Sequence, residues 1–466
     1  MKLRKIIIFI ILATSLQYIY GESVTLTLEK AVELALANNI EMQNARQDFL
    51  RAQAQRREAK ATAYPVLTTF AQQTYNPSLA AQPFDFPIPF GVLDENGNPV
   101  PIIDDPTHQQ TDIIPIEVNV SFGTDYQLVY GFNVTQPIFD GRVLAALRSA
   151  NVYGDLAQAS FDVSRLRVIE QTKIAFYRVL LSEHVVDVMK SSLKLIEQNQ
   201  RDTEALYKLG KAAEFDLIRV EVQVANQVSQ ISNARKTAAL AKAGLKRVCG
   251  LKQRADISVV GDIAIQSSEL PNYEELKVKL FQHQPLLTQL EANNKLMKEY
   301  ILLQKSEFMP SLSLTGSYQQ ILPYNSGNFN LGDFRKATTI GLSMNFPLFN
   351  GFGSVARIQQ ARADFKKSEY QLEDVKENLL VELSNLYLTL EEARNRIEAG
   401  IKSVKLAKRG VEIAQELYNR GMTTQLQVMD ANNARNQAEL GLAQAYFEYH
   451  TAHASLARVA GLDNLE

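Results

Sequence analysis

One stretch of the chain has the glycine spacing of a nucleotide-binding turn. The sequence Gly351-Phe352-Gly353-Ser354-Val355-Ala356 fits a dinucleotide fingerprint and lies between a predicted strand and a predicted helix. The fingerprint also requires a short strand–helix–strand unit with an acid at the end of the next strand. Here a much longer helical pattern follows, so we predict no nucleotide site. The sequence Leu209-Gly210-Lys211-Ala212 likewise lacks the earlier glycine and the hydroxyl of a phosphate loop.

Three other groups of residues have the types that bind metals or react. His450 and His453 share a helix face, but no third ligand is near them in the sequence, so we interpret them as surface histidines. The acidic sequence 94–98 misplaces the glycine of a calcium loop and lacks its closing glutamate, which favours a hairpin turn at Asn96-Gly97. The single cysteine, Cys249, can form no internal disulfide and is expected to pack as a small apolar residue. With no nucleophile elbow and no zincin pattern, we predict no enzyme activity, no cofactor and no metal site.

The elements around these residues are unusually long. From Tyr126 to Thr135 apolar residues alternate with mostly polar ones, which predicts a strand with one apolar face. After Gly141 the pattern becomes helical, and no proline follows until Pro271. A helix from about Arg142 to Tyr207 would be roughly 100 Å long at 1.5 Å per residue. The sequence therefore predicts an elongated assembly.

The same passage occurs twice in the chain. Residues 345–351 repeat residues 135–141, and a second uninterrupted helical pattern runs to Tyr418. Each half has the order helix, strand, loop, strand, long helix, turn, helix, and such an internal repeat is stronger fold evidence than any single motif. The predicted divisions are a signal peptide at residues 1–21, a first structural repeat at 22–256 and a second structural repeat at 257–466.

The remaining elements follow from the same patterns. A helix is expected from about Leu28 to Ala61, and its counterpart begins at Asn272. Each helix ends before a proline, Pro65 or Pro310, and a strand follows. The strand at 66–75 alternates poorly and is predicted from the repeat. The strand that leads into the second junction has a clear apolar face, which consists of Ile340, Leu342, Met344, Phe346 and Leu348.

Charge and hydropathy restrict the class of protein. The formal net charge is −2, and loss of Lys2, Arg4 and Lys5 with the leader would make it −5, so nucleic acid is not an expected partner. No stretch after the leader is long and apolar enough for a membrane helix, so any membrane span must consist of strands. Four strands cannot satisfy all their backbone groups in lipid as an open sheet, and we expect a barrel shared between subunits. A soluble four-stranded sheet is the alternative.

The segment between the first two strands differs in composition from the rest. From Ala61 to Gly141 there is no Lys or Arg, and eight of the fifteen prolines lie between Pro77 and Pro115. Prolines and turn residues disfavour a helix there. We therefore predict a long acidic external loop at residues 77–125.

The long helices carry apolar seams at coiled-coil spacing. The last helix has a seam of small residues, and its amides are expected on the remaining polar surface. The aliphatic seams are Leu379, Leu383, Leu386, Leu390, Ala393 and Ile397, and Leu217, Val220, Val224, Val228 and Ile231. The small seam is Ala431, Ala434, Ala438, Gly441 and Ala445, and the amides are Asn432, Asn433, Asn436 and Gln437.

The duplicated strand-Pro-Ile/Leu-Phe-Asp/Asn-Gly-helix unit resembles the TolC family of outer-membrane efflux and secretion ducts. The turns Tyr207–Gly210 and Tyr418–Gly421, each followed by a new helix, resemble it too. The resemblance spans essentially the whole mature chain. It implies an α+β membrane protein in which three subunits share a twelve-stranded outer-membrane β-barrel that a periplasmic α-helical barrel continues. It also implies a periplasmic adaptor protein and an inner-membrane pump as partners, outer-membrane lipid around the strands, and a belt that includes residues 252–270.

The resemblance also implies roles for particular residues. The turns at Gly210, Lys211, Gly421 and Met422 would dock the adaptor. Of two acidic rings in the family's gate, Gln427 would replace one and Asp430 would keep the other, where three carboxylates favour a cation. Thr423 stands where the family has a locking arginine, and Tyr418 and Asp216 match a hydrogen-bonded pair. The strand-to-helix junctions are Pro137, Phe139, Gly141, Pro347, Phe349 and Gly351.

Two functions remain open at this point. The first is a passive exit duct of an efflux pump or a type I secretion system in the outer membrane of a Gram-negative bacterium. The second is a trimeric surface stalk or adhesin anchored by a β-barrel. Strand pairs that lie between long helices in both repeats favour the duct, because a stalk needs one terminal set of strands. The sequence does not distinguish drugs, metals or proteins as cargo.

Overall fold

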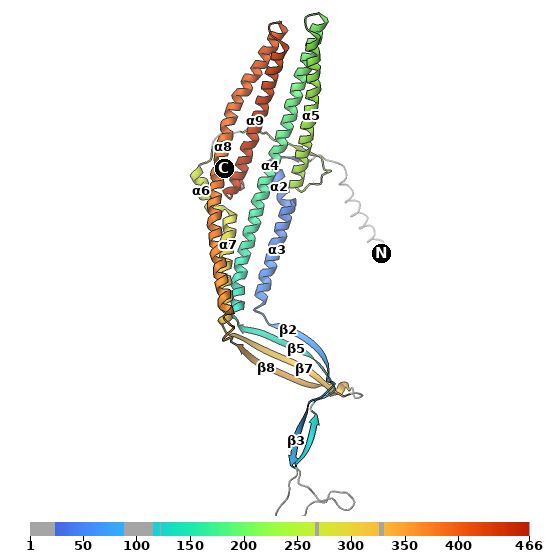
Figure 1. The fold of residues 1–466 in the computed structure, drawn as a ribbon, viewed down its shortest axis with the longest axis vertical. Helices are drawn as coiled ribbons and strands as arrows, with labels where there is room; N and C mark the ends of the chain where they lie inside the picture. Colours follow the sequence, from blue (N-terminus) through green and yellow to red (C-terminus); the bar gives the residue numbers. More distant parts are fainter. Residues whose placement is uncertain (1–23, 88–114, 122, 266–269, 326–329, 466) are drawn as a thin grey trace, which may run out of the picture. The chain divides into compact units, whose positions relative to one another are not determined.

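The computed structural model describes residues 24–87, 115–121, 123–265, 270–325 and 330–465 (Figure 1). The predicted signal peptide and the predicted turn at Asn96-Gly97 lie outside these residues. The chain forms two compact units, each built from separate segments. We call Glu58–Leu147 with Leu302–Arg357 the strand unit, and Met1–Arg57, Arg148–Ile301 and Ile358–Glu466 the helical unit.

The strand unit contains a four-stranded antiparallel sheet with the order β2-β5-β7-β8. The four strands confirm the sequence prediction, including the strand at 66–75, although β8 ends before Phe346 and Leu348. The register aligns Tyr75, Tyr126 and Tyr324, whose rings stack with centroids 4.8 and 5.1 Å apart. The strand bounds are β2 (Val66–Tyr75), β5 (Tyr126–Phe139), β7 (Ser311–Tyr324) and β8 (Arg335–Asn345).

The register divides the sheet into an apolar and a polar face. Val134 of β5 lies opposite Leu67 of β2, and Leu314 of β7 lies opposite Leu342 of β8. Because side chains alternate along a strand, their sequence neighbours point to the other face. That polar face presents Asn133, Thr135, Ser313, Thr315 and Ser343.

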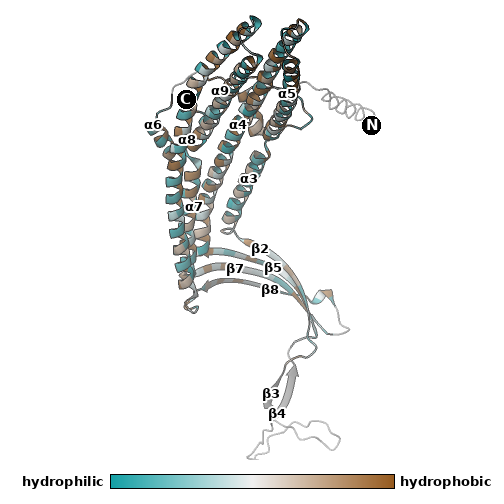
Figure 2. Cartoon of the chain, turned by 45° about the horizontal axis from the view of Figure 1, so that its top comes forward, coloured by the Kyte–Doolittle hydropathy of each residue, from teal (hydrophilic) through white to brown (hydrophobic). Residues whose placement is uncertain are grey.

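The helical unit contains two long helical hairpins (Figure 1). The predicted uninterrupted helices are confirmed, since α4 has 68 residues and α8 has 67. Among the described helices, none combines the length and hydropathy of a membrane span, and polar and apolar residues are mixed along them (Figure 2). The first hairpin consists of α4 (Gly141–Lys208) and α5 (Glu214–Val248), and the second of α8 (Gly353–Asn419) and α9 (Gln425–Val459).

The first predicted helix is divided in the structure. It consists of α2 (Leu28–Asn38) and α3 (Ile40–Ala61), separated by Asn39. Asn39 Nδ2 donates to the Val248 carbonyl at 2.8 Å, and its Oδ1 accepts from the Glu41 amide at 2.7 Å. The side chain thus caps α3 and binds the end of α5, and this tertiary contact overrides the continuous helical pattern.

The counterpart helix is divided in the same way. Gln284 separates α6 (Tyr273–His283) from α7 (Pro285–Lys305), and Pro285 restricts Gln284 to an extended backbone. Gln284 Nε2 donates to the Val459 carbonyl at 2.8 Å, at the end of α9. Asn39 and Gln284 therefore play equivalent roles in the two repeats. Each joins the break between two helices to the end of the last helix of its repeat.

The two larger apolar clusters in the core of the helical unit each join several helices. One joins α6, α7, α8 and α9 and contains most of the predicted aliphatic seam of α8. The other joins α2, α4 and α5 to a small parallel sheet of β1 (Val24–Leu26) and β6 (Ile257–Val259). Cys249 is fully buried there, as predicted. Burial raises the pKa of its thiol to about 11.

Parts of the predicted seams are wrong. On α5, Val228 is exposed and Gln227 is buried, where its Nε2 donates to the Met189 carbonyl. On α9, Ala434 and Gly441 are exposed. The buried stripe of α9 contains Gln425, Val428 and Asn432, so Asn432 does not lie on the polar surface.

The predicted external loop also contains strands. Within residues 77–125, β3 (Ala81–Pro87) pairs with β4 (Pro115–Ser121) as an antiparallel ladder. A two-stranded ladder tolerates proline because each strand keeps a free edge. In the described part of this segment, prolines therefore stand within strands.

Candidate functional site

The two helical turns at the ends of α4 and α8 have the same backbone. Gly210 and Gly421 have φ of 70° and 72°. The Lys211 amide donates to the Leu206 carbonyl at 2.9 Å, and the Met422 amide donates to the Leu417 carbonyl at 2.9 Å. These bonds define a Schellman motif, in which glycine is favoured because it adopts positive φ without strain.

A cavity of about 580 Å³ lies between the two turns in the helical unit. Three of the five predicted gate residues line it, namely Asp216, Tyr418 and Thr423. The other two, Gln427 and Asp430, are exposed on α9. The turns that are far apart in the sequence thus share one cavity, with Lys211, Arg219 and Arg420 among its charged residues.

Within the single chain, Tyr418 and Asp216 each have a partner other than the one predicted. Tyr418 is 8% exposed, and its hydroxyl lies 3.1 Å from Thr203 Oγ1 on α4. Asp216 lies 3.7 Å from Arg219 on its own helix. Because Thr203 is fully buried, this bond joins the two hairpins at a place where water is excluded.

Sequence analysis missed a set of buried polar residues between α4 and α9, of which Gln425 also lines this cavity. Ser192 of α4 accepts hydrogen bonds from Asn432 at 3.1 Å and Asn436 at 2.7 Å. Gln425 is 3% exposed, and neither its Oε1 nor its Nε2 has a partner among the described residues. Amides three or four residues from Val428 were the available signal, since a seam position is normally apolar.

At the first strand-to-helix junction, Asp140 caps the long helix α4. Its Oδ1 accepts from the Arg142 amide at 2.8 Å, and Arg142 Nη2 lies 2.9 Å from Oδ2. Burial raises the pKa of Asp140, but the hydrogen bonds from Arg142 outweigh it and leave the pKa below its usual value. A Cβ at Gly141 would lie 2.7 Å from Ser306 Cβ, so glycine permits a close approach there. Pro137 and Phe139 flank an irregularity in the pairing of β5 with β7.

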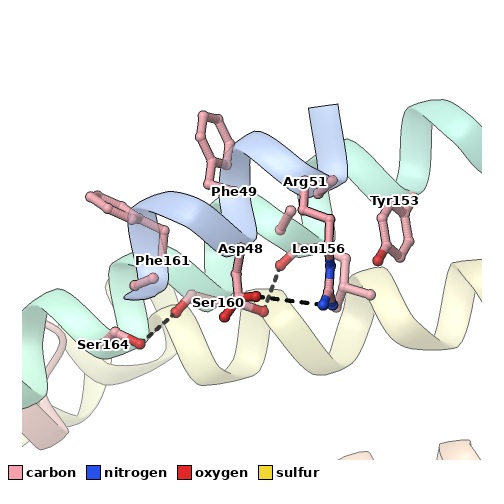
Figure 3. A pocket seen from close by; sticks show the side chains of 11 residues that line it. Asp48, Phe49, Arg51, Tyr153, Leu156, Ser160, Phe161 and Ser164 are labelled. Carbon is pink, nitrogen blue, oxygen red and sulfur yellow. Dashed lines mark hydrogen bonds and ion pairs between the residues drawn. The ribbon is translucent and has the colours of Figure 1, made fainter. Parts of the chain in front are cut away.

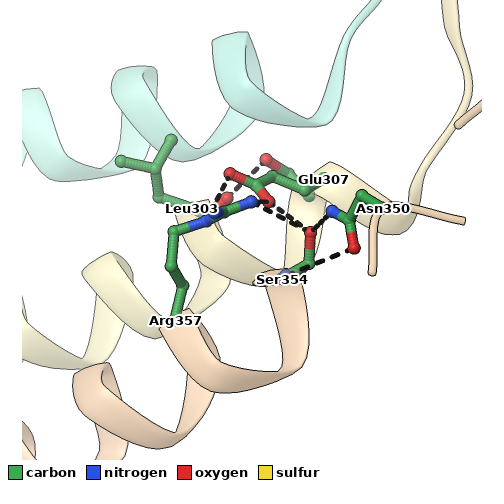
Figure 4. A network of polar contacts seen from close by, with 6 residues as sticks. Leu303, Glu307, Asn350, Ser354 and Arg357 are labelled. Atoms are coloured by element: carbon green, nitrogen blue, oxygen red, sulfur yellow. Dashed lines mark hydrogen bonds and ion pairs between the residues drawn. The ribbon is translucent and has the colours of Figure 1, made fainter. Parts of the chain in front are cut away.

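At the second junction, a network of polar side chains joins η1 (Ser306–Phe308) to the start of α8 (Figure 4). Glu307 accepts from Ser354 Oγ at 2.5 Å and from Arg357 Nε at 3.1 Å. These bonds from Arg357 and Ser354 lower the pKa of Glu307. Asn350 donates to Ser354 and completes the network. Pro347, Phe349 and Gly351 precede it in an irregular segment.

The predicted surface histidines are partly buried instead. Both line a cleft of about 560 Å³ in the helical unit. His450 Nε2 is 2.9 Å from the Ile263 carbonyl, and its ring stacks on Tyr177 at 3.8 Å. Burial, then Lys173 and His450, lower the pKa of His453 to about 4. Among the described residues, no three His, Cys, Asp or Glu side chains form a metal cluster.

A further cleft, of about 260 Å³, lies between α3 and α4 (Figure 3). Its rings Phe49 and Phe161 are 6.2 Å apart. Asp48 lies 3.8 Å from Arg51 in an exposed ion pair, and Ser164 Oγ donates to the Ser160 carbonyl at 3.2 Å. The ion pair and both serine hydroxyls of this cleft are thus engaged within the chain, and we assign it no chemistry.

Comparison with known proteins gives one consistent result. A family model described as outer membrane efflux protein matches residues 31–251 and 276–462. Alkaline protease secretion protein AprF of Pseudomonas aeruginosa is 21% identical over 333 residues, which cover 71% of this chain and 69% of AprF. Outer membrane protein TolC of Escherichia coli is 20% identical over 365 residues, which cover 72% of each chain. The CmeC outer membrane channel of Campylobacter jejuni is similar in structure, with a TM-score of 0.72 and 15% identity over 93% of this chain and 85% of CmeC.

Proposed function

The chain belongs to the outer membrane efflux protein family, and from this premise we propose that three copies form one shared exit duct. The predicted resemblance to the TolC family and the outer-membrane location are confirmed. The protein is an outer-membrane channel for efflux or type I secretion, and the alternative of a stalk or adhesin is not favoured.

The observation that carries the trimeric duct is the two-faced sheet with two free edges. Ile340, Leu342 and Met344 on the apolar face are 79%, 67% and 66% exposed in the single chain. Lipid would cover this face, and the polar face would line an aqueous lumen. Strands β2 and β8 lie at the edges of the sheet, and no edge can remain unpaired in lipid. Four strands from each of three copies would close a twelve-stranded barrel.

The helical unit would form the periplasmic part of the duct. Helices with mixed polar and apolar residues suit a tube with a wet lumen. The shared backbone of the turns at Gly210 and Gly421 supports their assignment as docking sites for a periplasmic adaptor. An inner-membrane pump behind that adaptor would supply the energy, and the chain itself would conduct passively. The name of AprF, which indicates secretion, and the description of the family, which indicates efflux, leave both classes of cargo possible for this chain.

The gate would lie at the same turns. Tyr418, held by Thr203, would lock the second hairpin to the first, and Asp216 and Thr423 would line the adjoining cavity. Three exposed Asp430 side chains would converge on the axis of the trimer, and Gln427 would contribute no charge. The division into repeats at 256/257 and the leader at residues 1–21 belong to the same proposal.

The decisive experiment measures assembly and conductance together. The detergent-extracted protein should have the mass of three chains and should form channels in lipid bilayers. Asp430→Asn should weaken block of these channels by divalent cations. A stable membrane-inserted monomer would exclude the shared barrel, and an unchanged cation block would exclude the Asp430 ring only.

The external loop has its own test. A tag after Gly97 should be accessible on intact cells, because long loops of outer-membrane barrels face outward. Labelling that requires a broken outer membrane would place the loop inside and contradict its assignment.

A further inference from the structure

Helix α9 begins without the acid that begins its counterpart α5. The residue four positions after Gly210 is Glu214, and the residue four positions after Gly421 is Gln425. The carboxylate of Glu214 interacts favourably with the positive end of the α5 dipole, whereas the first turn of α9 contains no acid. The start of α9, a helix of 35 residues, therefore has no negative charge of its own.

Gln425 is buried with both of its polar side-chain atoms unpaired. The residue is 3% exposed, and neither Oε1 nor Nε2 has a hydrogen-bond partner among the residues that the structure describes. Buried polar atoms in proteins are as a rule paired with protein, water or a ligand. Because Gln425 lines the cavity between the two helical turns, a molecule in that cavity can supply the missing partners.

The charges around the cavity favour an anion. Its lining contains three basic residues, Lys211, Arg219 and Arg420, and one acid, Asp216. Arg219 lies 3.7 Å from Asp216, and Arg420 pairs with Glu416 on its own helix. Within the described ranges, the side chain of Lys211 has no ion pair and no hydrogen bond. The Lys211 ammonium is therefore available to a ligand.

The groups at this site favour an oxyanion that also carries a hydroxyl. The first amides of a helix have no partner within it, and Thr424, Gln425 and Leu426 at the start of α9 all line the cavity. The side chain of Gln425 offers a donor, Nε2, and an acceptor, Oε1. Hydrogen phosphate presents acceptor oxygens and a hydroxyl donor, whereas sulfate at neutral pH presents acceptors alone. Hydrogen phosphate therefore matches both ends of the amide, and sulfate matches one.

We propose that this cavity binds a phosphate-type oxyanion, and that the bound anion joins the two hairpins and stabilises the closed gate. Lys211 belongs to the turn of the first hairpin and Gln425 to the second, so one ligand contacts both. Tyr418, which bonds to Thr203 between the same hairpins, lines the same cavity. Loss of the anion therefore loosens the hairpins where Tyr418 holds them. The binding site is independent of the proposed duct, and only its effect on the gate rests on that function.

Calorimetric titration of the detergent-solubilised trimer with inorganic phosphate, at constant ionic strength, tests the site directly. We expect saturable binding, roughly fivefold tighter than that of sulfate, because sulfate leaves Oε1 unpaired. Gln425→Leu and Lys211→Gln should each weaken the binding of phosphate about tenfold. Lys211 is exposed, so its variant keeps the test available if Gln425→Leu does not assemble. The matched control is Lys208→Gln, because Lys208 pairs with Glu204 and does not line the cavity, and it should bind phosphate like the wild type.

A further variant supplies the negative charge from the chain itself. Gln425→Glu places a carboxylate where α5 has Glu214. Phosphate should raise the melting temperature of the wild type but not that of Gln425→Glu, because the new carboxylate repels the anion and interacts with the helix end in its place. In lipid bilayers at constant chloride, phosphate should lower the resting conductance of the wild type and leave that of Gln425→Glu unchanged.

The outcomes separate the site, its role in the gate and the proposed duct. Absence of saturable phosphate binding overturns the site, whatever the channel does. Acetate or sulfate that binds as tightly as phosphate overturns the assignment of a phosphate-type ligand, and an equal loss of affinity in Lys208→Gln reveals binding to general surface charge, which also overturns the site. Phosphate binding with an unchanged conductance overturns the role in the gate. Absence of channels from the wild type would overturn the duct and leave the calorimetric result intact.

Discussion

The two strand-to-helix junctions have matching sequences but different means of support. At the first junction, Gly141 enters α4 directly, and its backbone approaches Ser306 and Met309. At the second junction, Gly351 stands in a positive-φ turn with nothing within 4 Å of an added Cβ. Glycine is therefore needed at position 141 because a side chain would collide with its neighbours. At position 351 it is needed because the backbone has positive φ. A repeated motif thus fixes the order of elements, while the local environment decides what each residue contributes.

The two helical turns differ in the opposite sense. Their backbones are equivalent, but Tyr207 of the first turn is 40% exposed and Tyr418 of the second is 8% exposed. Helix α5 begins with Glu214 and Asp216, whereas the first turn of α9 contains no acid. The acids that follow the Gly210 turn interact favourably with the dipole of α5. The Gly421 turn has no such acids, and its Tyr418 is held by contact with α4.

The largest expected effect distinguishes the two junction glycines. Gly141→Ala should lower the free energy of unfolding by about 3 kcal/mol, because the new Cβ collides with Ser306 and Met309 in a packed site. Gly351→Ala should cost about 1 kcal/mol, since it only strains a positive φ. Thermal unfolding of the detergent-solubilised trimers measures both. Equal shifts would show that the junctions are supported alike.

The next effect concerns His453. The equivalent position of the first hairpin holds Lys242, which is half-buried and pairs with Glu183 at 2.7 Å. Burial, Lys173 and His450 lower the pKa of His453 to about 4, whereas an unfolded chain binds that proton near its ordinary value of 6.5. Because the unfolded chain binds this proton more tightly than the folded one, the free energy of unfolding is highest above pH ~6.5. It decreases as the pH falls towards 4. We expect a loss of about 2 kcal/mol between pH 7 and pH 4.5.

His453→Gln should flatten this dependence in melts across that range. His184→Gln, on α4 outside this cleft, serves as the matched control. If the wild type and His453→Gln lose stability in parallel, the acid sensitivity originates elsewhere.

A smaller effect compares the two turn tyrosines. Tyr418→Phe should cost about 1 kcal/mol, because it leaves Thr203 buried without its hydroxyl partner. It should also raise the resting conductance of single channels, since the bond joins the two hairpins. Tyr207→Phe should change neither quantity measurably. Equal behaviour of the two variants would remove Tyr418 from the gate.

The sequence predicted those features that depend on periodicity and repetition. The four sheet strands and both long helices follow from alternation and from the absence of glycine and proline, and the structure has them near the predicted bounds. The interruptions at Asn39 and Gln284 were missed because each depends on a bond to a distant helix end, at Val248 and Val459. A local pattern carries no information about such a partner.

The candidate site was predictable only in part, for the same reason. The turns around Gly210 and Gly421 are local motifs, and their positive φ agrees with the expected helix ends. The partner of Tyr418 depends on which face of α8 meets α4, and the burial of Asn432 depends on which face of α9 meets α4. The predicted small seam includes Ala434 and Gly441, which are exposed. Roles that require three chains, such as that of Asp430, remain predictions.

The smallest expected effect is a gain in stability at the second junction. Phe352→Gly removes a side chain from a positive-φ position, and glycine adopts this conformation freely. Because glycine also gains freedom in the unfolded chain, the net stabilisation in detergent should be under about 1 kcal/mol. The matched variant Arg142→Gly should change stability in the opposite direction by about 1 kcal/mol, since it places glycine inside a helix and removes the partner of Asp140. Thermal melts of the two trimers in the same detergent measure both signs. If Phe352→Gly lowered the melting temperature in detergent, the Phe352 side chain would stabilise the strand unit from within.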